Sequence, residues 1–264
     1  MKKVYLVTFH KTNAYGPLLQ AYASWKTIEQ FGFQFYFIDY CSKTESSQVE
    51  GFVFSKTAVI HILKRLVKNK IFKANKNLYA SFHNFLSSFP LTDKCKSLKD
   101  LDSLSADIFI VGSDQLWNPS ISGGLDPAFY LNFGQAKKRV SLATSVGSHI
   151  FDEREKERIK IWLSRFSAVS VRERFAQSEI QSLYHKDVEI ICDPTFWLDG
   201  DYWRRISKKP IGITAGCYIL YYALSNTQPK FSAEALRKAS MQLNLPVYSL
   251  SSLPIKHSGV DRVI

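Results

Sequence analysis

Short apolar runs recur along the chain, and several of them end in small or polar residues. The runs at 4–9, 33–38, 108–111 and 168–171 are rich in β-branched and aromatic residues, and the third has no polar alternation. Such a run is typical of a strand that is buried on both faces, as in a parallel sheet covered by helices. The pattern therefore predicts an α/β fold built on a Rossmann-like parallel sheet.

The first two runs are separated by a stretch with helical periodicity. Apolar side chains recur there at spacings of four and three residues, at Leu18, Tyr22, Trp25 and Ile28. This spacing predicts an amphipathic helix that packs on the sheet. Pro17 suits the first helical turn, and Gly16 is the expected N-cap. The free N–H groups at such a helix start favour an anionic ligand, either a phosphate or a carboxylate.

The residues after the third run have the composition of a binding site. Ligands of open α/β sheets bind just beyond the carboxyl ends of the strands, where Gly112 would let a ligand approach the backbone. Ser113, Asp114 and Gln115 offer hydrogen-bond donors and acceptors, and Trp117 offers a flat apolar wall. The alternative is a strand that stops in a polar turn, because turns also favour Gly, Ser and Asp.

The chain is strongly basic, with 35 basic and 23 acidic residues and a formal net charge of +12. Much of this charge lies between residues 56 and 76, where basic and apolar residues mix and no acidic residue occurs. The spacing predicts a basic amphipathic helix over 56–76, which either contacts an anionic membrane or packs on its own domain. No nucleic-acid-binding motif accompanies the charge, so no nucleic-acid partner is expected.

The composition argues against several other kinds of site and location. No pair of histidines or cysteines has a metal-ligand spacing, so no metal site is expected. The G-x-G-x-x-G fingerprint of NAD and FAD sites is absent, and no cofactor is predicted. The absence of a signal peptide and of a run of about eighteen apolar residues predicts a cytoplasmic protein. The scattered cysteines are expected to be reduced, namely Cys41, Cys95, Cys192 and Cys217.

Five segments occur in an order and at spacings that resemble one enzyme family. They are His10 with 15–23, then 107–118, 139–147, 170–173 and 193–195. Together they resemble the motifs of the polysaccharide pyruvyl transferases, over residues 4 to 224, and five ordered motifs are specific where one would be weak. The departures from the family pattern remove no ionisable group; they are Ala14, Pro17 and Leu142.

The resemblance implies a bacterial enzyme that transfers the enolpyruvyl part of phosphoenolpyruvate to a sugar. The product would be a pyruvate ketal in the precursor of a cell-surface polysaccharide. Phosphoenolpyruvate is then the donor substrate, and the acceptor is a saccharide or a lipid-linked saccharide. Because family members resemble two-domain glycosyltransferases of the GT-B type, two Rossmann-like lobes are also implied.

The chemistry of the implied reaction indicates which residues to consider. Arg172 follows a predicted strand and is expected to bind an anionic group of the donor; the alternative is an ion pair with Glu173 or Asp193. His10 is the candidate general acid, and a structural histidine is the alternative. The other expected substrate-binding residues are Asn13, Tyr15, Gly16, Gly112, Ser113, Asp114, Gln115, Trp117, Ser145 and Gly147.

The second lobe is expected to be incomplete. The motifs predict a first lobe over 1–194, a helical linker over 195–216 and a partial second lobe over 217–264. The last segment contains a buried strand at 217–223, followed by a helix and a strand that complete one βαβ unit. A Rossmann-like lobe of ordinary size needs about 100 residues or more.

Catalysis by these residues alone is not expected, because the family's distal histidine motif has no match in this chain. Two alternatives to a pyruvyl transferase stay open. One is a GT-B-type glycosyltransferase that uses a nucleotide sugar. The other is an inactive remnant or a binding module.

Overall fold

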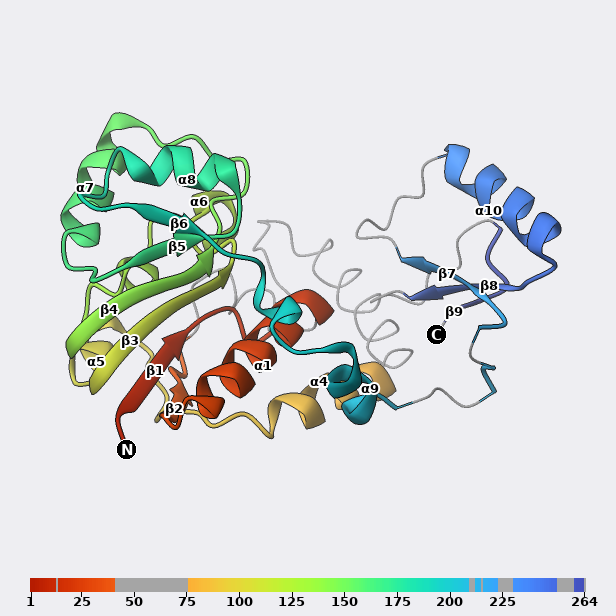
Figure 1. The fold of residues 1–264 in the computed structure, drawn as a ribbon, viewed down its shortest axis with the longest axis horizontal. Coiled ribbons are helices and arrows are strands. Elements are labelled where there is room, and N and C mark those ends of the chain that lie inside the picture. The colour runs from red at the N-terminus through yellow and green to blue at the C-terminus, as the bar shows by residue number, and fades with distance from the viewer. Residues whose placement is uncertain are drawn as a thin grey trace, which may run out of the picture. The chain divides into compact units, whose positions relative to one another are not determined.

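The computed structural model describes residues 1–12, 14–40, 76–208, 212–214, 216–222, 230–250 and 259–263. The chain divides into two compact units (Figure 1), residues 1–53 with 82–202 and residues 54–81 with 203–264. The predicted basic helix over 56–76 lies outside the described residues, apart from its last position. Asn13 and Cys41 also lie outside them.

A parallel sheet forms the centre of the first unit. Within the described residues it has six strands, in the order β2-β1-β3-β4-β5-β6. Their bounds are Lys3–Val7 for β1, Gln34–Phe37 for β2, Ser105–Asp114 for β3, Gln135–Thr144 for β4, Val169–Val171 for β5 and Val188–Ile190 for β6. The strand order reverses between β1 and β3, which is where doubly wound sheets form a ligand crevice. The predicted Rossmann-like α/β fold is confirmed.

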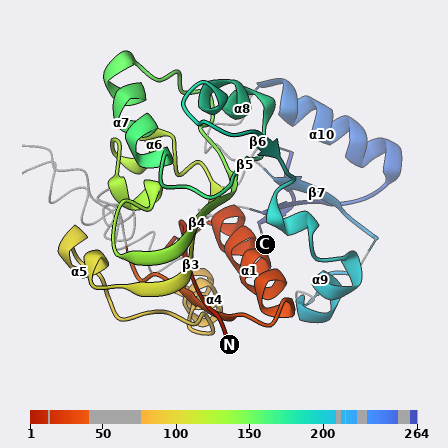
Figure 2. The same cartoon turned by 60° about the vertical axis from the view of Figure 1, so that its left-hand side comes forward.

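Helices occupy the connections between these strands, and η2 and α9 follow the last strand, β6 (Figures 1 and 2). Their bounds are Tyr15–Gln30 for α1, Lys76–Leu86 for α4, Leu98–Asp102 for α5, Pro119–Ser122 for α6, Pro127–Tyr130 for η1, Glu153–Leu163 for α7, Arg174–Gln181 for α8, Pro194–Phe196 for η2 and Gly200–Ile206 for α9. One core cluster joins Val111 of the sheet to Ile159 of α7 and Ile180 of α8. These two helices therefore cover the face to which Val111 points.

Helix α1 confirms the predicted amphipathic helix but begins earlier than expected. Its N-cap is Ala14, which has an extended backbone, and not Gly16. The tyrosine at the first helical position explains the shift, because the ring of Tyr15 packs against Phe82 with centroids 5.0 Å apart. Pro17 still lies in the first turn, where a missing N–H costs no hydrogen bond.

The second unit contains a smaller parallel sheet in the order β7-β8-β9, as far as it is described. Its elements are β7 (Ile219–Tyr222), α10 (Lys230–Leu243), β8 (Val247–Leu250) and β9 (Arg262–Val263). The predicted βαβ unit is present. However, Leu220 and Tyr222 are about half exposed, so β7 is not buried on both faces as its composition predicted. No helix in the described ranges is long and apolar enough to span a bilayer.

Candidate functional site

The loops that follow β1 and β3 lie side by side at the carboxyl edge of the large sheet, since the two strands are parallel neighbours. Beyond β1, the Thr8 hydroxyl donates a hydrogen bond to the carbonyl oxygen of Ser113 at 3.3 Å. The Ser113 N–H in turn donates to Oε1 of Gln20, in α1, at 3.1 Å. Residues 112–115 and the start of α1 therefore lie at one edge of the sheet.

Gln20 connects three elements at this edge. Its side chain is buried, and besides accepting from Ser113 its Nε2 donates to the Thr8 hydroxyl and to the Pro17 carbonyl, both at 2.9 Å. Sequence reasoning missed this residue. The available signal was a single polar side chain within the otherwise apolar run 18–23, which a buried hydrogen-bonding role explains.

Strand β3 continues through the polar residues that follow its apolar run. It ends at Asp114, because Gly112 pairs with Leu142 and Asp114 pairs with Thr144 on β4. Gly112 has a φ of 132°, a conformation that favours glycine. A Cβ at this position would overlap with the carbonyl oxygen of Leu142. The glycine therefore permits the close approach of β3 and β4 at the site.

Gly112→Ala is expected to lower the free energy of unfolding by about 3 kcal/mol, because the strained φ and the overlap with Leu142 act together. Urea unfolding of both proteins measures the difference. Gly124→Ala is a matched control, since Gly124 has a φ of 115° but open space around it. Equal losses in the two variants would show that the close approach to β4 contributes nothing.

Arg172 lies among three carboxylates that come from three strand ends. Its Nη1 donates to Asp193 at 3.0 Å, and its other nitrogens lie 3.5 Å from Glu173 and 3.6 Å from Asp114. We call these four residues the Arg172 cluster. The ion pairs with Glu173 and Asp193, weighed above as an alternative to donor binding, are both present. Only the contact with Asp193 is short enough to be a hydrogen bond.

The cluster has an excess of negative charge, because one guanidinium faces three carboxyl groups. Burial raises the pKa of Asp114, and the nearby Asp193 raises it further. The N–H of Gln115 and the charge of Arg172 act in the opposite direction. An arrangement of this kind can hold or move a proton as well as bind a polar ligand.

His10 is fully buried, and its ring stacks on Phe37 with centroids 5.7 Å apart. Its Nδ1 lies 2.9 Å from the carbonyl oxygen of Thr8, which can only accept, so Nδ1 carries the proton. The Nε2 atom finds no hydrogen-bond partner in the described part of the chain. Burial lowers the pKa of His10 to about 4. A ring that is neutral at pH 7 suits a hydrogen-bond acceptor better than the general acid expected from the sequence.

Ser145, Gly147 and Gln115 lie next to the Arg172 cluster. The Ser145 hydroxyl donates to Glu173 at 2.6 Å and accepts from the Gly147 N–H at 2.9 Å. Gln115 accepts from Asn118 at 2.9 Å. A Cβ on Gly147 would overlap with the Gln115 side chain. The structure thus brings these three predicted residues together.

The sequence suggested that Trp117 forms an apolar wall of the binding site, but the structure does not place it there. Its side chain lies in the core, 1% exposed, where Nε1 donates to the Phe129 carbonyl at 2.7 Å. Tyr15 and Gly16 lie in the first turn of α1, and Gly16 has open space around it. These two residues remain at the edge of the sheet, whereas Trp117 supports the loop from within.

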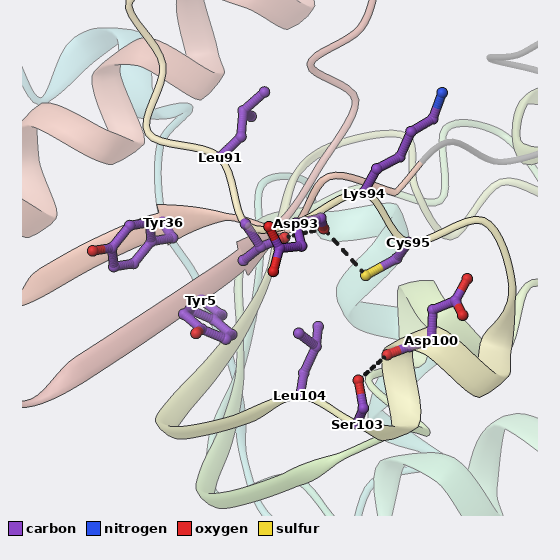
Figure 3. A pocket seen from close by; sticks show the side chains of 10 residues that line it. Tyr5, Tyr36, Leu91, Asp93, Lys94, Cys95, Asp100, Ser103 and Leu104 are labelled. Atoms are coloured by element: carbon purple, nitrogen blue, oxygen red, sulfur yellow. Dashed lines mark hydrogen bonds between the residues drawn. The ribbon is translucent and has the colours of Figure 1, made fainter.

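A separate pocket of the first unit is shown in Figure 3. Its lining residues are Tyr5, Tyr36, Leu91, Thr92, Asp93, Lys94, Cys95, Asp100, Ser103 and Leu104. None of the predicted site residues is among them, and Asp100 already caps α5 by accepting from the Ser97 N–H. No group of three or more His, Cys, Asp or Glu suited to a metal ion occurs among the described residues. Cys95, Cys192 and Cys217 are free thiols.

Comparison with known proteins identifies the family of this chain. Among solved structures the chain is similar to a functionally uncharacterised protein from Klebsiella pneumoniae subsp. pneumoniae NTUH-K2044, with 15% identity and a TM-score of 0.35 over 65% of this chain and 75% of that one. No curated protein matches. The family model described as polysaccharide pyruvyl transferase matches residues 15–248, a range that contains the whole Arg172 cluster. The chain therefore belongs to the polysaccharide pyruvyl transferase family.

Proposed function

We propose that this protein transfers the pyruvyl group of phosphoenolpyruvate to a sugar in the precursor of a cell-surface polysaccharide. Family membership supports the reaction class. The observation that supports this site is the convergence of Arg172 with hydroxyl and carboxyl groups at the carboxyl ends of β3, β5 and β6. The expected product is a ketal formed with two hydroxyls of one sugar.

Arg172 is the proposed ligand of an anionic group of the donor. Phosphoenolpyruvate carries a phosphate and a carboxylate, and a guanidinium can donate two parallel hydrogen bonds to either. Although three carboxylates surround Arg172, its only hydrogen bond in the described structure is the one to Asp193. Its contacts with Glu173 and Asp114, at 3.5 and 3.6 Å, are longer than a good hydrogen bond, so an anionic ligand can compete for those N–H groups.

The start of α1 supports an anionic donor as well. No acidic residue lies in its first turn, and the N-cap Ala14 has no side-chain cap. The N–H groups of Tyr15 and Gly16 thus lie at the N-terminus of the helix, where the helix dipole favours a negatively charged ligand. The partly exposed carboxyl groups of Asp114 and Glu173 suit the hydroxyls of a saccharide acceptor.

The acceptor that we propose is a saccharide or a lipid-linked saccharide, modified in the cytoplasm. Contact of the basic segment 56–76 with an anionic membrane surface would bring a lipid-linked acceptor near the enzyme. No cofactor is proposed besides the donor substrate.

Arg172→Ala is expected to weaken phosphoenolpyruvate binding by about 2 kcal/mol, roughly 30-fold, through loss of a charge-assisted contact. Isothermal calorimetry on the full chain measures the affinity, and thermal unfolding shows whether the fold is kept. Arg158→Ala, which changes an exposed arginine of α7, is the matched control.

Equal affinity of the Arg172→Ala variant and the parent protein would refute the role of Arg172. Binding of nucleotide sugars in place of phosphoenolpyruvate would favour glycosyl transfer instead. Mass spectrometry of a saccharide incubated with donor and protein then tests for the ketal itself.

A further inference from the structure

The three carboxyl groups of the Arg172 cluster differ in how many hydrogen bonds hold them. Asp193 accepts from the N–H and hydroxyl of Thr195 through one oxygen, at 3.0 and 2.7 Å, and from Arg172 through the other, at 3.0 Å. Both of its oxygens are therefore occupied by hydrogen-bond donors.

Glu173 is held in the same way. One of its oxygens accepts from the Ser145 hydroxyl at 2.6 Å and from the Val146 N–H at 3.3 Å, while the other faces Arg172. Both oxygens of Glu173 therefore also face donors.

Asp114 is the exception. Its Oδ1 accepts from the Gln115 N–H at 2.8 Å and lies 3.6 Å from Arg172, whereas its Oδ2 has no partner among the residues that the structure describes. The side chain is 20% exposed, so a ligand at the strand ends can reach it. Of the three carboxyl groups, Asp114 thus has the oxygen that is free to carry a proton.

The backbone of Asp114 is constrained as well. It has a φ of 79°, which is unfavourable for a residue other than glycine. The position is fixed from both sides, since its carbonyl accepts from the Ser145 N–H at 2.9 Å and its carboxyl accepts from the next residue. Conformations of this kind persist where the surrounding structure enforces them, and they cluster at functional sites.

We propose that Asp114 is the proton-transferring catalytic residue of this site, and that Asp193 and Glu173 position Arg172. This inference rests on the proposed pyruvyl transfer. The charged groups that face Asp114 are Arg172 from the end of β5 and Asp193 from the end of β6. Burial and the nearby Asp193 favour the neutral form of Asp114, which is the form that can donate.

In the proposed reaction Asp114 acts first as a proton donor and then as a proton acceptor. Neutral Asp114 gives its proton to the methylene carbon of phosphoenolpyruvate, the C=C electron pair forms the new C–H bond, and the central carbon becomes electron-deficient. A lone pair of the first sugar hydroxyl bonds to that carbon, and the hydroxyl proton returns to Asp114. The second hydroxyl then displaces phosphate, which leaves with the electron pair of its C–O bond and takes the second hydroxyl proton. Asp114 ends in its starting state.

Asp114→Asn tests the proposal, because the amide keeps the size of the side chain and its acceptor for the Gln115 N–H but cannot transfer the proton. We expect kcat for ketal formation to fall about 100-fold or more. Phosphoenolpyruvate affinity, measured by calorimetry, should stay within about threefold, since Arg172 is kept and a neutral amide replaces a neutral carboxyl group. Asp187→Asn, at an exposed aspartate before β6, is the matched control.

A second measurement does not depend on catalytic activity. Side-chain carboxyl NMR of protein with 13C-labelled aspartate, assigned with the Asp114→Asn variant, should show that the pKa of Asp114 lies above the ordinary value of an aspartate. A pKa of Asp114 at or below the ordinary value would overturn the assignment. So would a larger loss of kcat in Asp193→Asn than in Asp114→Asn.

Failure of the proposed function and failure of the role of Asp114 give different experimental results. A parent protein that binds no phosphoenolpyruvate and forms no ketal refutes the proposed function, and the inference with it. A parent protein that forms the ketal while Asp114→Asn retains its kcat refutes the role of Asp114 alone.

Discussion

Arg139→Met is expected to lower the free energy of unfolding by about 4 to 5 kcal/mol, close to the whole stability of many domains. The Arg139 side chain is buried within β4, and its guanidinium donates to four backbone carbonyls at 2.8 to 3.3 Å, three before β4 and one at its start. These acceptors belong to Leu131, Phe133, Gly134 and Ala136, of which Leu131 and Phe133 are buried. Methionine fills a similar volume but leaves all four carbonyls without this donor.

Chemical denaturation of the parent protein and the variant measures this loss. Arg165→Met is the matched control, because Arg165 is exposed and, among the described residues, its side chain donates only to Asn132, at 2.7 Å. We expect that control to lose less than about 1 kcal/mol. A loss below about 1 kcal/mol in Arg139→Met would mean that water replaces the guanidinium as the donor.

Trp117→Ala is expected to cost about 4 kcal/mol, the range found when a large buried aromatic side chain is removed. The indole stacks on Tyr130, with centroids 5.4 Å apart and an angle of 5° between the planes, and its N–H satisfies the Phe129 carbonyl. The substitution would remove the stack and the hydrogen bond and leave a cavity beneath residues 112–118.

Trp162→Ala provides the comparison for this variant. Trp162 packs on the same Tyr130 ring, 5.0 Å between centroids, but it is only partly buried. A smaller loss is expected there in thermal and urea unfolding. If the two variants lose the same stability, burial of Trp117 does not dominate the energy of this aromatic stack.

The elements that the sequence predicted well have a signal within a few neighbouring residues. The runs at 4–9, 33–38 and 108–111 became β1, β2 and β3, because unbroken apolar residues need burial on both faces of a sheet. The helical spacing from Leu18 to Ile28 became α1 for the same local reason.

Strand β4 had no such signal. Its first half contains Lys137, Lys138 and Arg139, a charged run that does not resemble a central strand. The two lysines are exposed, and Arg139 is accommodated by carbonyls that only the folded turn brings together. Tertiary contacts therefore decide this strand, and sequence periodicity could not.

The sequence indicated residues of the candidate site but not how they are arranged in space. The family motifs indicated Asp114 and Arg172 separately, and the two residues are 58 positions apart in the chain. Their contact exists because β4 lies between β3 and β5 and all three strands run in the same direction. The burial of His10, which determines its protonation state, likewise depends on Phe37 of a neighbouring strand.

The hydrogen bonds of Gln20 give the protein an internal spectroscopic probe. Its amide group contacts both the start of α1 and the peptide N–H of Ser113, so a ligand that moves either one alters the chemical shift of the side-chain NH2 group. Burial slows the exchange of these two protons with solvent, which keeps their signals visible at neutral pH. Occupancy of the strand ends can therefore be followed in the unmodified protein, without any label on the ligand.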